Sequence, residues 1–241
     1  MTFMFKLPSL LFLRPIASLL LFILILLAGP VQGGQYHCAG LDLIEITAPD
    51  HGMVKNICQA SAKAVAFLAN YRLGPKRLIN IKIIETIIDN HGYLAYGSYD
   101  RQSDLIELIS LPAILKSTPP PQMYGQPFDR EHYQAAIAHE IAHAIFQHNC
   151  AEIKEQLTSA AQEYLAHATQ MGVLSDKRRN EIIKANKVEP WESGDSIDVT
   201  YMAIDPTGFA VKSYLHLTRM ADPQPFIRLL LRNNWFYLSV P

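Results

Sequence analysis

The sequence predicts an α+β domain in which a helix and a small β-sheet come first and a helical half follows. Segments before residue 117 are rich in β-branched and aromatic residues, which favour strands. After residue 127, apolar residues recur at the spacing of amphipathic helices. Residues 117–127 contain consecutive prolines, so we expect a loop that separates two halves of one domain. The 49% hydrophobic content is ample for a packed core and excludes a disordered chain.

The first 33 residues have the pattern of a secretory signal peptide. Lys6 and Arg14 precede an apolar run over residues 16–27, and Gly33 ends a short segment with small residues. As a helix this run would extend about 18 Å, which is short of the roughly 30 Å hydrocarbon core of a bilayer. We therefore expect cleavage after Gly33 and export. The competing interpretation is an uncleaved membrane anchor, because residues 7–13 are also apolar.

Residues 34–241 are expected to form one domain with one disulfide. The three cysteines, Cys38, Cys58 and Cys150, all lie in this part, and an exported protein can form disulfides. We favour the pair Cys38 and Cys58, which would tie the start of the domain to its first helix, and we expect Cys150 to be free. Three buried thiols are the alternative.

The charge pattern excludes some partners. The formal net charge is −1, and cleavage after residue 33 would remove two basic residues. No basic face is indicated, so we expect no nucleic acid as a partner, and a membrane only if the N-terminal segment is uncleaved.

The first half is predicted to contain one helix and three strands. Asp50 can cap a helix that continues to about Asn70. Three segments have strand composition and are separated by turn residues, so at least two of them should form a hairpin: residues 78–88, 93–99 and 104–110.

The second half is predicted to be helical. Asp129 and Ser175 stand at the starts of two of its helices and can cap them, and a proline opens each of the last two. The expected helices cover residues 130–148, 152–173, 175–186, 206–219 and 223–232, and residues 187–200 are expected to be irregular.

The first of these helices contains a metal-binding pattern. His139 and His143 are four residues apart, so their imidazoles lie on one face of a helix, and Glu140 stands beside the first of them. This is the HExxH pattern, in which the two histidines bind zinc and the glutamate is a general base. The flanking positions are uncharged, as expected for a helix buried beneath a metal: Ile137, Ile141, Ala142, Ala144 and Ile145.

Catalytic zinc takes three protein ligands, so a third is needed. Glu163 is the best candidate, because a turn near residue 150 would fold the next helix back and bring residue 163 level with His143. His148 has the wrong spacing, and we expect it to interact with the helix dipole instead. Glu152 and Glu155 lie nearer the turn and are expected to be solvated.

Residues 136–167 resemble the gluzincin zinc metallopeptidases, which combine HExxH with a glutamate on the following helix. The resemblance implies that His139, His143 and Glu163 are zinc ligands and that Glu140 is the base. In that family an edge strand before the active-site helix holds the substrate backbone.

By this resemblance, residues 104–110 would be the edge strand. Two positions depart from the family. His167 stands where an aspartate often orients the first histidine, and Gln162 replaces the usual asparagine before the glutamate. Such outer partners tune metal affinity by about 10–100-fold.

The sequence therefore predicts an exported zinc metallopeptidase with a peptide or protein substrate. Zinc would lower the pKa of a bound water toward about 7, and Glu140 would take its proton. His167, Tyr201, Tyr214 and His216 are candidates for outer ligand partners or for the donor that stabilises the oxyanion. Two alternatives stay open: a catalytically silent zinc-binding module, and a membrane-tethered interaction protein in which HExxH is a coincidence.

Overall fold

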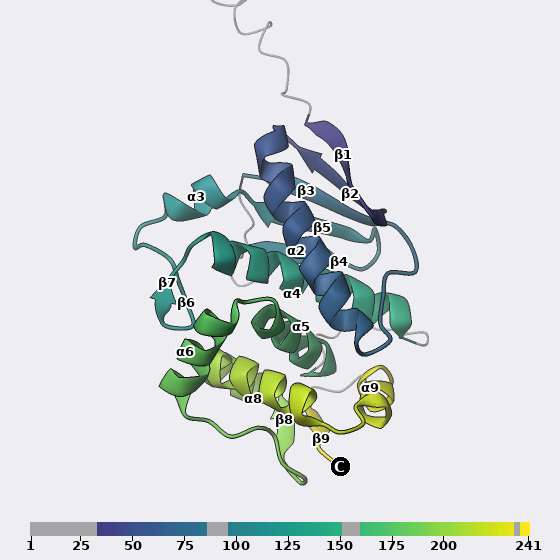
Figure 1. Cartoon of the computed structure of the whole chain (residues 1–241), viewed down its shortest axis with the longest axis vertical. Helices are drawn as coiled ribbons and strands as arrows, with labels where there is room; N and C mark the ends of the chain where they lie inside the picture. Colours follow the sequence, from purple (N-terminus) through teal and green to yellow (C-terminus); the bar gives the residue numbers. More distant parts are fainter. Residues whose placement is uncertain (1–32, 86–95, 151–159, 234–236) are drawn as a thin grey trace, which may run out of the picture. The chain divides into compact units, whose positions relative to one another are not determined.

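The computed structural model describes residues 33–85, 96–150, 160–233 and 237–241, and it contains a five-stranded sheet (Figure 1). The strand order is β1-β2-β3-β5-β4. The strands are β1 Gly34–Cys38, β2 Leu41–Ala48, β3 Ile79–Ile84, β4 Gly97–Asp100 and β5 Leu105–Ile109. With helices filling the second half, the predicted α+β class is confirmed. The predicted signal peptide lies outside the described residues, apart from Gly33.

The sheet combines parallel and antiparallel pairs. β2, β3 and β5 run parallel, whereas β1 is antiparallel to β2 and β4 is antiparallel to β5. The predicted hairpin is thus β4–β5. The sequence prediction omitted β1 and β2, although alternate residues of β2 are buried and Gly40, with φ +75°, supplies the tight turn between the two strands.

The edge of the sheet differs from the expectation. β5 covers the predicted segment 104–110 but lies inside the sheet, between β3 and β4. In the described chain β4 is therefore the outer strand on this side of the sheet, with β1 on the other side, and the expectation that 104–110 is the edge strand is wrong. The reason is that parallel pairing with β3 occupies one side of β5, so its hairpin partner takes the outer position.

Helix α2 (His51–Ala69) connects β2 to β3. Its N-cap is Asp50, as predicted, and the carboxylate accepts hydrogen bonds from the backbone N–H groups of Gly52 and Met53. The predicted disulfide between Cys38 and Cys58 is confirmed and joins β1 to α2. Cys150 is a free thiol.

The predicted helices of the second half are found, with small differences at their ends. Their bounds, together with the shorter helices, are α3 Leu111–Leu115, α4 Arg130–Asn149, α5 Ala160–Gly172, α6 Asp176–Asn186, α7 Val199–Ile204, α8 Pro206–Arg219 and α9 Gln224–Leu230. Asp129 and Ser175 cap α4 and α6 as predicted. Residues 151–159 lie outside the described residues, so the start of the predicted helix 152–173, Glu152 and Glu155 do too.

Two short strand pairs lie where irregular chain was expected. β6 (Gln122–Met123) and β7 (Gln126–Pro127) form a small hairpin within the predicted loop. β8 (Ser196–Asp198) pairs with β9 (Tyr237–Ser239), although residues 187–200 were expected to be irregular. Pairs this short carry little sequence pattern of their own.

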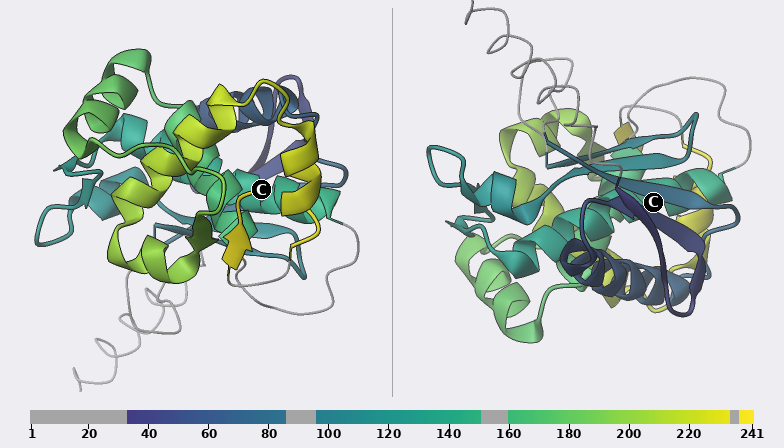
Figure 2. Two further views of the ribbon diagram at one scale, coloured as in Figure 1. Left: turned by 90° about the horizontal axis from the view of Figure 1, so that it is seen from below. Right: turned by 90° about the horizontal axis from the view of Figure 1, so that it is seen from above.

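Helix α4 is the centre of the packing. It contacts α2 and β4 on one side and α5 on the other, and α5 in turn packs against α8 (Figure 1). Seen from below, α8 and α9 lie in front of α4 (Figure 2). Most residues of α4 and α5 are consequently buried, which places both faces of the HExxH helix inside the protein. In the described part of the chain, no helix has both the length and the apolar character needed to cross a bilayer.

Candidate metal centre

His139 and His143 point their Nε2 atoms at each other from successive turns of α4. The two Nε2 atoms are 3.0 Å apart, and the rings meet edge to face with their centroids separated by 4.7 Å. The four-residue spacing of the motif thus brings both imidazoles to one point, as the sequence predicts.

Glu163 of α5 faces both histidines. One carboxylate oxygen is 3.6 Å from His139 Nε2, and the other is 3.7 Å from His143 Nε2. The side chain of His167, one turn further along α5, places its Nε2 3.9 Å from the first of these oxygens. His139, Glu163 and His167 form a group whose ligand atoms lie within 4.8 Å of one another and that could hold a metal ion. His143 lies against the same carboxylate, so four side chains converge.

Gln170 fixes the orientation of His139. Its Oε1 lies 3.0 Å from His139 Nδ1, and its amide nitrogen contacts the sulfur of Met123 on β6. A carbonyl oxygen can only accept, so Nδ1 of a neutral His139 carries the proton and Nε2 presents its lone pair to the group. Sequence reasoning missed Gln170, although it follows Glu163 and His167 on the same face of α5 at helical spacing.

The histidines of the group are held in the neutral form that metals require. Burial lowers the pKa of both His139 and His143 to about 4, and His143 adds to the effect on His139. Burial also lowers the pKa of His167. Between 12% and 15% of the surface of each of the four side chains remains exposed, so the group still reaches solvent. Three neutral imidazoles beside one carboxylate are a donor set that suits a transition metal.

Glu140 lies beside the group without belonging to it. Its side chain packs against Gly97 of β4, where an added Cβ would come within 2.8 Å of Glu140 Cγ. Burial, followed by the nearby Glu163 carboxylate, raises the pKa of Glu140 to about 8. The importance of Gly97 had no signal in the sequence, because the contact joins elements that are far apart along the chain.

The remaining candidates from the sequence lie elsewhere. Tyr201 contacts the rings of Trp191 and Phe209, and the guanidinium of an arginine lies over the ring of Tyr214. His216 Nδ1 lies 2.8 Å from the hydroxyl of Tyr164. Among the described residues, none of these contacts brings Tyr201, Tyr214 or His216 to the four converging side chains.

His148 has partners of a different kind. Its buried ring accepts a hydrogen bond at Nδ1 from the backbone N–H of Lys76 and donates from Nε2 to Asp104 at 2.9 Å. The exclusion of His148 from the ligand set agrees with this geometry. His148 lies in the last turn of α4, as the expected role at the helix dipole requires, and it adds two specific hydrogen bonds that join α4 to Lys76 and Asp104.

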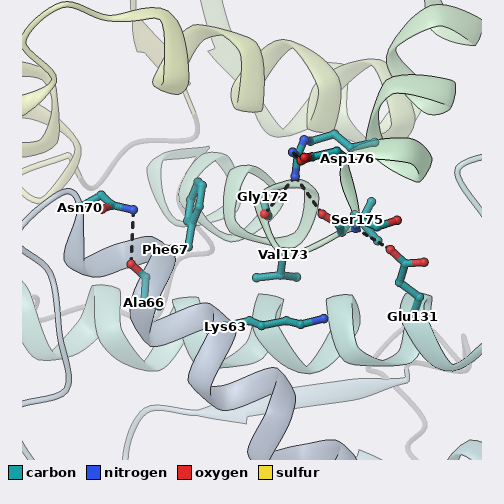
Figure 3. Close-up of a pocket in the computed structure, with 11 residues that line it drawn as sticks. Lys63, Ala66, Phe67, Asn70, Glu131, Gly172, Val173, Ser175 and Asp176 are labelled. Carbon is teal, nitrogen blue, oxygen red and sulfur yellow. Dashed lines mark hydrogen bonds and ion pairs between the residues drawn. The ribbon is translucent and has the colours of Figure 1, made fainter.

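A separate groove of about 660 Å³ lies between α2 and the segment that joins α5 to α6 (Figure 3). Lys63 and Phe67 of α2 face Val173 and Ser175 across it. None of the converging metal donors lines this groove, so it does not belong to the candidate centre.

Comparison with known proteins gives one match. The model of DUF6639, a family of unknown function, matches residues 44–239, which include every element of the candidate centre. Searches of curated proteins and of solved structures found no match.

Proposed function

We propose that this chain, which belongs to the DUF6639 family, is an exported zinc metallopeptidase that hydrolyses peptide bonds. His139, His143 and Glu163 would hold the zinc, and Glu140 would be the general base. The proposed export is supported by the signal-peptide pattern and by the disulfide between Cys38 and Cys58, which suits an oxidising compartment.

The observation that carries the proposal is the pair of Nε2 atoms 3.0 Å apart, both facing one carboxylate. Tetrahedral zinc with bonds of 2.0–2.1 Å separates its donor atoms by about 3.3 Å. The distances of 3.6 and 3.7 Å from the histidines to Glu163 are close to that value. Nitrogen and oxygen donors of this kind, in an HExxH sequence, favour zinc over the harder calcium and magnesium ions.

When bound, zinc would lower the pKa of a water molecule and polarise the carbonyl of a substrate. Glu140 would supply the proton transfers. Its carboxylate would accept the proton of that water and return it to the leaving amine. Gln170 would keep His139 in the tautomer that presents Nε2.

The position of strand β4 supports the proposal that the substrate is a peptide. It is one of the two outer strands of the sheet in the described chain, and Gly97 on it touches Glu140, which the other outer strand, β1, is not found to do. An extended peptide that adds to this edge would hydrogen-bond through its main chain and run past the general base.

The test is the variant Glu140→Gln. The amide keeps the shape of the side chain but cannot accept the proton, so hydrolysis of a broad peptide library should fall by about 10²–10⁴-fold while the zinc content stays unchanged. Wild-type activity in this variant would refute the metallopeptidase mechanism. If neither protein cleaves any peptide but both bind zinc, the function is that of a silent zinc-binding module.

A further inference from the structure

We infer that His167 is a fourth protein ligand of the metal, so that His139, His143, Glu163 and His167 together would close the resting centre and leave a position for water only when this imidazole is not bound. The inference rests on the proposed function and adds a form of regulation to it. It concerns the one position of the centre where this sequence departs from the gluzincin pattern with a residue that can itself bind metal.

The position of His167 is that of a ligand. Its Nε2 lies 3.9 Å from the oxygen of Glu163 that also faces His139, which exceeds the donor separation in tetrahedral zinc by roughly 0.6 Å. The rings of His139 and His167 meet edge to face, 4.8 Å apart. Both histidines therefore approach the same carboxylate oxygen, as two ligands of one ion would.

The hydrogen bonding of His167 is incomplete without an ion. Its Nδ1 is buried and has no partner among the described residues. The 3.9 Å from Nε2 to Glu163 is too long for a hydrogen bond. The nitrogen that faces Glu163 therefore has no hydrogen-bond partner in the described chain and is available to bind an ion. A cation between the four side chains would give Nε2 a partner.

The ring of His167 packs against two other rings. Phe209 of α8 lies edge to face with it at 5.5 Å, and His139 lies on another side. These edge-to-face ring contacts hold the imidazole in place, and neither makes a hydrogen bond with it in the described chain. The surroundings therefore point the polar edge of the ring toward Glu163.

The number of protein ligands decides the state of a zinc site. Structural sites have four protein donors, whereas catalytic sites keep the fourth position for water. With His139, His143, Glu163 and His167 bound, the centre resembles a structural site, but Glu140 beside it supplies a base that a structural site does not need. A resting state closed by His167 reconciles these two features.

The experiment is X-ray absorption spectroscopy of the zinc-loaded full protein, which counts the imidazoles bound to the metal. The wild type should show three imidazoles. The variant His167→Phe, which keeps a ring for the contacts with Phe209 and His139, should show two and bind zinc at least about tenfold more weakly. Because it opens a position for water, it should also hydrolyse peptides faster per bound zinc. His148→Ala is the matched control and should still show three imidazoles.

The outcomes separate this inference from the proposed function. Two imidazoles in both the wild type and His167→Phe, with equal zinc affinity, would overturn the fourth ligand and leave the metallopeptidase intact. A wild-type protein that binds no zinc would overturn both. If His167→Phe fails to fold, His167→Gln is the second variant, and it should likewise show one imidazole fewer than the wild type.

Discussion

Helix α4 carries four histidines, and among them His148 differs from His139 and His143 in what its nitrogens meet. His148 has a protein partner at each nitrogen, the backbone N–H of Lys76 and the carboxylate of Asp104. His139 and His143 turn their Nε2 atoms toward each other and toward Glu163. Burial lowers the pKa of all three, so neither burial nor the direction of the pKa shift distinguishes a structural histidine from a ligand.

The distinction is clearest between His148 and the two histidines, His143 and His167, that leave a nitrogen without a partner in the described chain. His148 needs nothing more, because both of its nitrogens are satisfied within the protein. The Nδ1 atoms of His143 and His167 are buried without a partner in the described chain, and their Nε2 atoms lie 3.7 and 3.9 Å from the two oxygens of Glu163. A cation would complete this arrangement of neutral donors around a carboxylate.

The largest expected effect is on zinc-dependent stability. At a zinc concentration about 1,000 times the dissociation constant, binding should stabilise the folded wild type by about 4 kcal/mol relative to protein in chelator. His143→Ala should lose this difference, because a ligand is gone. Thermal unfolding with zinc and with chelator measures it.

The matched variant for this comparison is His148→Ala. It should keep the zinc-dependent difference but unfold more easily in both conditions, by about 1–3 kcal/mol, because Lys76 N–H and Asp104 lose their partner. Loss of the zinc effect in His148→Ala, or its persistence in His143→Ala, would remove the distinction between His148 and His143.

A second expected effect concerns the base rather than the ligands. In Gly97→Ala the new Cβ would come within 2.8 Å of Glu140 Cγ, so Glu140 must move. A displacement of this kind should lower the rate of peptide hydrolysis by about 10²-fold with the zinc content unchanged. Gly74→Ala is the control, since its Cβ would meet nothing within 4 Å. An unchanged rate in Gly97→Ala would argue against Glu140 as the base.

The smallest effect should be a loss of folding stability in acid, caused by protonation of Asp104, the partner of His148. Burial of Asp104 opposes ionisation, but hydrogen bonds from Arg77, Tyr99 and His148 outweigh it and lower the pKa of Asp104 from 3.8 to about 2. Because the folded-state pKa is depressed, this carboxylate stabilises the fold fully above about pH 4, and the contribution disappears as the pH falls toward 2.

Asp104→Asn removes this pH dependence. The wild type should lose its stability advantage over the variant between about pH 4 and pH 2 in denaturant titrations, and zinc content at neutral pH should be equal. Asp42→Asn, at an exposed position of β2, should show no such convergence. If the difference in stability between the wild type and Asp104→Asn stays constant across this range, the charge of Asp104 is not what stabilises its contact with His148.

The sequence predicted what local pattern controls. The N-caps Asp50, Asp129 and Ser175, the fold class and the pairing of Cys38 with Cys58 are confirmed. The convergence of His139, His143 and Glu163 was also expected, because helical spacing and a turn between two helices determine it.

The rest depends on which elements meet in space. The place of β4 at the outer edge, the contact of Gly97 with Glu140 and the partners of His148 each join residues that are distant in sequence. Chemistry alone suggested Tyr201, Tyr214 and His216 as candidates. The sequence does not show which side chains surround them, and in the structure these are rings and polar groups outside the candidate centre.

The zinc content of the purified protein is the most direct test of the account. Elemental analysis should find about one zinc per chain in the wild type and in Glu140→Gln, and almost none in Glu163→Ala, because only the last variant loses a ligand. A wild type without zinc after loading, or a full equivalent of zinc in Glu163→Ala, would contradict the claim that these side chains form a metal centre.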